Sequence, residues 1–110
     1  MMYEVKSIIR PERVAAVVHA LHEIPDVPGL TISVVRGIGR RTPTGSTAAE
    51  FGETEMAKLE TVVPEQLLQR VVDTVRDVAG TGRAGDGKVF VMRVEDAFKV
   101  GSGARGSDVL

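Results

Sequence analysis

Two segments of this chain have the periodicity of an amphipathic helix, and each follows a proline. In the first, apolar residues recur with helical spacing at Val14, Val17, Val18 and Leu21. The second follows Pro64 and carries an apolar stripe over residues 67–79. Pro11 and Pro64 suit the first position of a helix, because the missing N–H has no partner there. Each helix has one apolar face, which must pack against another apolar surface. A chain of 110 residues is the length of a single domain, 1–110, so both helices are expected to share one core.

Four other segments are short and rich in β-branched residues, so they are predicted to be strands: 2–9, 30–36, 58–63 and 88–94. Between the second and third lies Gly37–Ala57, which is rich in Gly, Thr, Ser and Ala without a regular period and is predicted to be a long exposed loop. Gly80 is expected to end the second helix with a positive φ.

The order of these segments is βαββαβ, which predicts an α+β fold of the ferredoxin-like type. Its antiparallel four-stranded sheet would carry both helices on one face, leaving the other face and the edges uncovered. Burying them against identical subunits is the natural remedy in a chain this small, so we expect a homo-oligomer.

Composition and charge exclude several classes of function. The net charge is −1, which gives no general attraction to nucleic acid or to an anionic membrane. The chain has no cysteine, which excludes disulfides, thiolate zinc sites and a cysteine nucleophile. The N-terminal residues do not resemble a signal peptide, and no apolar run is long enough to insert into a membrane, so a soluble cytoplasmic protein is expected. No catalytic constellation is evident, which predicts that the protein is not an enzyme.

The most informative segment is the glycine-rich stretch Thr81–Lys88. Its three glycines let the backbone turn tightly, and successive N–H groups that point into one concavity bind phosphate. Arg83 and Lys88 can supply positive charge. The stretch is not a P-loop, and a helix-to-strand turn that needs glycine only for its shape is the alternative.

Four collinear segments resemble the PII nitrogen-regulatory signalling proteins. They are Ile8–Pro11, Gly29–Arg40 (GLTISVVRGIGR), Lys58–Pro64 (KLETVVP) and, most specifically, Thr81–Val91 (TGRAGDGKVFV). Together they span the whole chain at matching spacing.

The resemblance implies a homotrimer that binds ATP, ADP or AMP in clefts between subunits. It identifies residues 81–88 as the B-loop around the phosphates, 38–57 as the T-loop that reaches a partner protein, and 95–110 as the C-terminal tail. Family relatives are often paired with membrane transporters or metabolic enzymes, so one of these is the expected partner. By matched position, the implied nucleotide-binding residues are Thr31, Gly37, Arg40, Val62, Gly85, Asp86, Gly87, Lys88 and Lys99.

The chain departs from the family pattern at several of these positions. The phosphate-clamping Arg-x-Arg pair of the tail falls at Lys99 and Gly101, so triphosphate binding should weaken most, with Arg105 as a candidate replacement. The T-loop is about four residues shorter by this comparison. Its magnesium-linked glutamine falls at Arg41 and its 2-oxoglutarate-binding lysine at Met56, which leaves magnesium open and argues against 2-oxoglutarate sensing.

A second hypothesis keeps the fold without the nucleotide. His19 and His22 lie three residues apart on the first predicted helix and could bind a metal in a metal-tolerance or metal-sensing trimer. Ordinary surface histidines are the alternative.

Overall fold

The computed structural model describes residues 1–39 and 52–110. Its elements follow the order βαββαβ, with a short 3-10 turn, η1, before the first helix and another, η2, near the C-terminus. Their bounds are β1 Met2–Ile9, η1 Pro11–Arg13, α1 Val14–His22, β2 Thr31–Gly39, β3 Gly52–Pro64, α2 Glu65–Ala79, β4 Gly87–Val94 and η2 Gly106–Val109.

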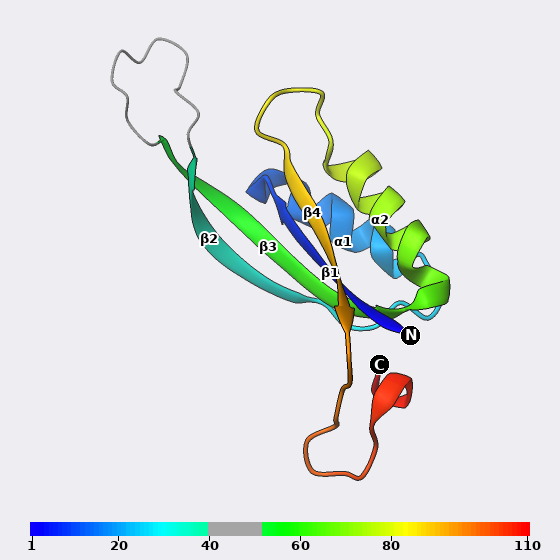
Figure 1. Cartoon of the computed structure of the whole chain (residues 1–110). Coiled ribbons are helices and arrows are strands. Elements are labelled where there is room, and N and C mark those ends of the chain that lie inside the picture. The colour runs from blue at the N-terminus through cyan, green and yellow to red at the C-terminus, as the bar shows by residue number, and fades with distance from the viewer. Residues whose placement is uncertain (40–51) are drawn as a thin grey trace.

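The four strands form one antiparallel sheet in the order β2-β3-β1-β4. Both helices lie on the same face of it, as Figure 1 shows. The ferredoxin-like fold predicted from the segment order is therefore confirmed. β2 and β4 form the two edges of the sheet, and β1 and β3 lie between them.

The core lies between the helices and the two central strands. Side chains of β1 alternate, so Val5 and Ile9 are fully buried against the helices while Lys6 between them is only partly buried. The helices contribute their apolar stripes, among which Val17, Leu21, Val71 and Val75 are also fully buried. Burial of these aliphatic side chains is the main term that holds the layers together.

The strand bounds correct one expectation. Gly37–Ala57 is not a loop throughout, because β2 continues to Gly39 and β3 begins at Gly52 rather than at Lys58. The two strands pair residue by residue up to Gly39 and Gly52, so they form a ribbon beyond the helices (Figure 1). Among residues 1–39 and 52–110, nothing of the core packs on this ribbon, and its residues therefore lack the apolar alternation that identifies a half-buried strand.

Gly80 also differs from expectation. It ends α2 with a φ of −69°, so a positive φ is not what it provides. A Cβ at this position would lie 2.8 Å from the carbonyl oxygen of Arg76, and glycine is required by that close approach instead.

Within residues 1–39 and 52–110, the helices are too short or too polar to cross a bilayer.

Gly87 offers a test of how β4 is seated against β1. Its φ is +111°, and an added Cβ would lie 1.8 Å from the carbonyl oxygen of Ile8. We expect Gly87→Ala to lower the free energy of unfolding by about 2–3 kcal/mol, because both the backbone conformation and the strand contact must give way. Gly82→Ala is the control, since Gly82 has a positive φ but open space around it, and should cost about 1 kcal/mol. Equal losses in urea unfolding would contradict this account.

Candidate functional site

The loop between α2 and β4 is a tight turn. Gly82, Gly85 and Gly87 all have positive φ, between 80° and 111°. Other residues adopt this conformation only with strain, so the glycines that suggested the site from sequence also have a conformational reason to be there. The prediction that these glycines allow a tight turn is confirmed.

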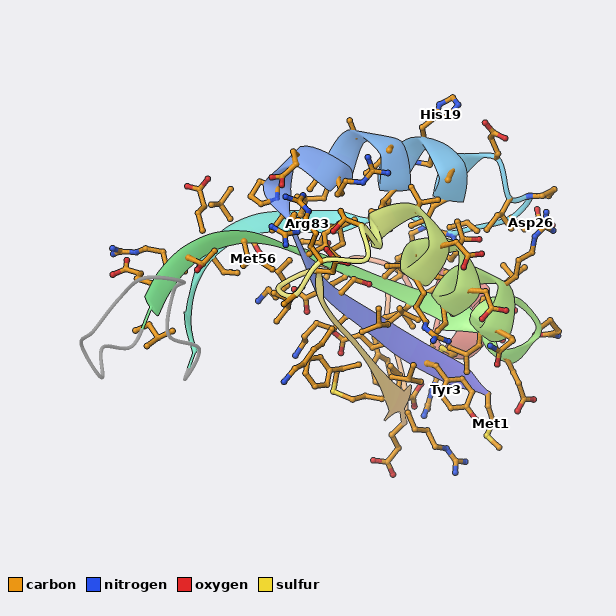
Figure 2. The ribbon with its side chains drawn as sticks, turned by 90° about the horizontal axis from the view of Figure 1, so that it is seen from above. Met1, Tyr3, His19, Asp26, Met56 and Arg83 are labelled. Atoms are coloured by element: carbon orange, nitrogen blue, oxygen red, sulfur yellow. The ribbon has the colours of Figure 1, made fainter. Side chains whose placement is uncertain are left out.

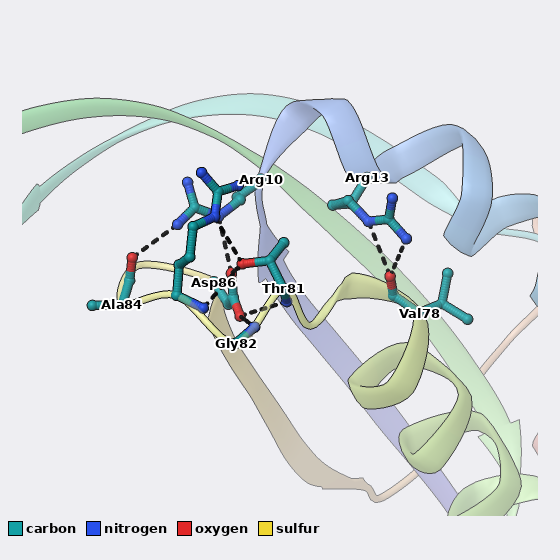
Figure 3. Close-up of polar contacts among 8 residues, drawn as sticks. Arg10, Arg13, Val78, Thr81, Gly82, Ala84 and Asp86 are labelled. Atoms are coloured by element: carbon teal, nitrogen blue, oxygen red, sulfur yellow. Dashed lines mark hydrogen bonds and ion pairs between the residues drawn. The ribbon is translucent and has the colours of Figure 1, made fainter.

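A single carboxylate organises this loop from within. Asp86 accepts hydrogen bonds from the backbone N–H of Thr81 at 2.7 Å and of Gly82 at 3.1 Å. It also accepts one from the Thr81 hydroxyl. That hydroxyl in turn accepts a bond from the Arg83 backbone N–H at 3.2 Å. The side chain therefore joins the two ends of the loop (Figure 3).

Arg10 attaches the loop to the rest of the domain. It follows β1, and its Nε donates to the Asp86 carboxylate at 3.0 Å while its Nη2 donates to the Ala84 carbonyl oxygen at 2.8 Å. Arg13, from η1, donates instead to the Val78 carbonyl oxygen at the end of α2, with its Nε at 3.0 Å. Figure 3 shows Arg10 bound to the loop and Arg13 bound to the helix before it.

These donors determine the charge state of Asp86. The hydrogen bonds from Thr81, first from its hydroxyl and then from its backbone N–H, together with that from Arg10, hold the pKa of this carboxyl well below its usual range. Asp86 is therefore ionised at any physiological pH. It is also the only carboxylate in the loop, between the cations Arg83 and Lys88.

The groups of the loop that are free to contact a ligand are not the groups that hold its shape. Backbone N–H groups at 81–83 are already bonded within the loop. No hydrogen bond among the described residues engages the backbone N–H of Ala84 or Gly85, nor the side chain of Lys88, which is exposed. An anion would therefore meet these two amides and this ammonium group, while Asp86 serves the shape of the loop.

Three other predicted residues, Thr31, Gly37 and Val62, lie on β2 and β3. Thr31 pairs with Glu60, Val62 pairs with Glu4, and Gly37 lies farther along, opposite Thr54 in the ribbon. Thr31 and Val62 line one open hollow of about 510 Å³. The remaining lining residues are Glu4, Pro28, Gly29, Glu60, Thr61, Val109 and Leu110.

Two carboxyl groups give this hollow an acidic lining. A hydrogen bond that Glu4 donates to Glu60, and then burial, raise the pKa of Glu4, while the same bond lowers the pKa of the accepting Glu60. The Lys58 Nζ lies 3.5 Å from the Glu60 Oε1 and offsets part of the negative charge of the hollow. The hollow thus offers polar acceptors beside the apolar Val62, and no concentration of positive charge.

The structure therefore divides the predicted site into two parts. Thr31 is on β2, at one edge of the sheet, and Lys88 is on β4, at the other edge. Two strands lie between them, which places the two backbones about 14 Å apart. Within one chain, Thr31 and Val62 do not meet Gly85, Asp86, Gly87 and Lys88 at one point.

The tail folds as a small hairpin. The Lys99 backbone N–H donates to the Ala104 carbonyl oxygen at 3.0 Å, and the Lys99 side chain is exposed. Arg105 is occupied: it is paired with Asp96, whose pKa it lowers, and lies 5.0 Å from the Phe98 ring centroid. Of the two candidate tail cations, Lys99 is the one free to contact a ligand.

Arg40 and Arg41 lie outside the described residues. Met56 is partly buried on β3 opposite Val35, and it supplies no charge there. His19 is on the side of α1 that faces away from the sheet (Figure 2), with its Nε2 2.7 Å from a Glu23 carboxylate oxygen. Among residues 1–39 and 52–110, no three His, Asp or Glu side chains come together as metal ligands do.

Arg10 is the site residue that sequence reasoning missed. In the sequence it is only the residue between the predicted strand 2–9 and Pro11. The topology contains the signal that could have identified it. In this βαββαβ sheet β1 and β4 are antiparallel neighbours, so the end of β1 lies beside the start of β4, and Ile9 pairs with Gly87. The residue that follows β1 therefore lies beside the glycine loop.

Comparison with known proteins gives similarity along almost the whole chain. The family model described as nitrogen regulatory protein P-II matches residues 2–104. Nitrogen regulatory protein P-II of Rhodospirillum rubrum is 34% identical over 115 residues, which cover 99% of this chain and 100% of the relative.

Two solved structures support the same relationship. The crystal structure of Arabidopsis thaliana PII bound to citrate has a TM-score of 0.80 and 36% identity, covering 97% of this chain and 90% of that one. The structure of B. subtilis GlnK has a TM-score of 0.84 and 28% identity, covering 99% of this chain and 98% of that one.

The role of Asp86 can be tested through pH. Its pKa is lower in the folded state than the value near 3.9 of an unfolded chain, so its contribution to stability is present above that pH and is lost as pH falls toward the folded pKa. We expect Asp86→Asn to have a lower urea midpoint than the parent at pH 7, and the difference between the two midpoints to shrink as pH falls below about 4. A difference in midpoint that stays constant down to pH 3 would show that the carboxylate charge does not hold the loop.

Proposed function

The chain belongs to the nitrogen regulatory protein P-II family, and from this premise we propose that it is a homotrimer that binds an adenine nucleotide between subunits. Members of this family are signalling regulators, and the fold of this chain matches theirs. The proposed nucleotide is ATP, ADP or AMP, and the proposed output is regulation of a partner protein through residues 38–57.

The division of the site between opposite sheet edges carries this proposal. Thr31 and Val62 lie at the β2 side, and the glycine loop with Lys88 lies at the β4 edge. A ligand that needs both parts can reach them only if a second copy places its β4 loop beside the first copy's β2 edge. The site is then completed by assembly.

The exposed apolar residues support such an assembly. Ile32 and Val34 on β2 are 47% and 70% exposed, and Phe90 and Val91 on β4 are 45% and 46% exposed. Each edge thus presents apolar side chains that a monomer leaves in water. A contact of one edge with the opposite edge of the next copy is heterologous, and it closes into a ring when the rotation permits.

The residues present fit a nucleotide that spans the two parts. Val62 and Thr31 offer an apolar contact and a hydroxyl for a base, which is uncharged. Lys88 and the free amides of Ala84 and Gly85 offer a point charge and two donors for phosphate. Lys99 in the tail is one further cation, where the family pattern has two arginines. One clamping charge fewer favours ADP or AMP over ATP.

The segment proposed to reach the partner begins and ends in the β2–β3 ribbon. Arg36 pairs with Glu53 at 2.6 Å across it, and the two strands stay paired to Gly39 and Gly52. The nucleotide would act on the partner by favouring one arrangement of residues 38–57 over another. We propose a membrane transporter or a metabolic enzyme as that partner.

We expect size-exclusion chromatography with light scattering to give a trimer, and titration calorimetry to detect binding of at least one of ATP, ADP and AMP. Lys88→Ala should weaken that binding about tenfold to a hundredfold, because one charge-assisted hydrogen bond to phosphate is lost. Arg70→Ala, which removes an exposed cation from α2 far from the loop, is the control and should leave affinity unchanged. A monomer, or no heat with any of the three nucleotides, would refute the proposal.

A further inference from the structure

We propose that Arg10 is a positioning residue for phosphate binding, which acts by holding and neutralising Asp86 and not by contacting the nucleotide. This inference rests on the proposed function and adds to it a residue from outside the glycine loop. It also assigns Asp86, implied by resemblance to hold phosphate, to the supporting structure of the loop.

The geometry of the guanidinium gives the first reason. Arg10 uses two different nitrogens on two different loop residues, Asp86 at 3.0 Å and the Ala84 carbonyl oxygen at 2.8 Å. A planar fork that binds two points fixes both their separation and their orientation. Those points flank Gly85, so Arg10 determines where the unbonded N–H groups of Ala84 and Gly85 lie.

Electrostatics gives the second reason. Asp86 is ionised, and an approaching phosphate carries the same sign of charge. Arg10 places a positive charge against this carboxylate, with both side chains about four-fifths shielded from solvent. Paired in this way, Asp86 repels phosphate less, and Arg83 and Lys88 are left to attract it. Without Arg10, the carboxylate charge would act on the ligand at close range.

The two reasons lead to an effect that depends on ligand charge. Loss of the loop's shape alone would weaken every nucleotide equally. Loss of neutralisation weakens a nucleotide more as its phosphate charge rises, and high salt reduces the difference by screening. The ratio of ATP to AMP affinity therefore separates a positioning and neutralising residue from a merely structural one.

The test uses Arg10→Gln, Asp86→Asn and the double variant in the intact trimer, titrated with ATP, ADP and AMP at low and high salt. Arg10→Gln should weaken the binding of ATP on the order of tenfold and the binding of AMP on the order of threefold or less, and this difference should shrink at high salt. The double variant should lose less ATP affinity than the two single variants lose together, because the charge that Arg10 neutralises is already absent. Arg13→Gln, which removes the contact to the end of α2, is the matched control and should leave the ATP-to-AMP ratio unchanged.

Equal loss for all three nucleotides, or fully additive losses in the double variant, would overturn the inference. A loss at Arg10 that grows with phosphate charge but is independent of Asp86 would show direct contact with phosphate instead, and would overturn it as well.

Hydrogen exchange without nucleotide separates this inference from the proposed function. Arg10→Gln should raise the exchange rates of the Thr81 and Gly82 amides about tenfold, since it loosens the carboxylate to which both are bonded. Unchanged exchange would refute the positioning role. If the parent trimer binds no nucleotide, the proposed function fails, while exchange still decides whether Arg10 holds the loop.

Discussion

The structure depends on a sheet that its helices cover on one face only. β1 and β3 bury their inner side chains under α1 and α2, which satisfies the core of a single copy. The same arrangement leaves β2 and β4 as edges with apolar residues in water, and it places Thr31 on one edge and the glycine loop with Lys88 at the other. One constraint of packing therefore accounts both for the apolar residues exposed at the edges and for candidate site residues that do not meet within one chain.

The glycine loop shows how a turn can be prepared for an anion before one arrives. Backbone N–H groups at its start converge as they would on a phosphate oxygen, but the chain's own Asp86 carboxylate already occupies them. The loop therefore has its shape without a ligand, and less ordering is left to be done on binding. The cost is a negative charge beside the proposed phosphate position, which the pairing with Arg10 offsets.

The sequence predicted the fold well because its signals were local and mutually consistent. The first strand, the two proline-led helices and the glycine loop are each specified by nearby residues, and their order leaves few topologies. Gly52–Met56 gave no such signal, because a ribbon without a core needs no apolar alternation. For the site, the sequence indicated the glycine loop, but it gave no sign that Asp86 is hydrogen-bonded to Thr81 and Gly82 within that loop. It also passed over Arg10, whose contacts join residues 76 apart in the chain.

β2 connects the two functions proposed for this molecule. Its first residue, Thr31, lines the hollow at the body of the domain, and the same uninterrupted strand runs on to Gly39 at the end of the ribbon. The β3 ladder and the Arg36–Glu53 pair hold that strand along this length. A paired ribbon transmits a shift or a restraint at its base to its far end better than a flexible loop of the same length could. Because part of the expected loop is strand, the proposed nucleotide position at the sheet edge has a continuous structural connection to the segment proposed to reach a partner.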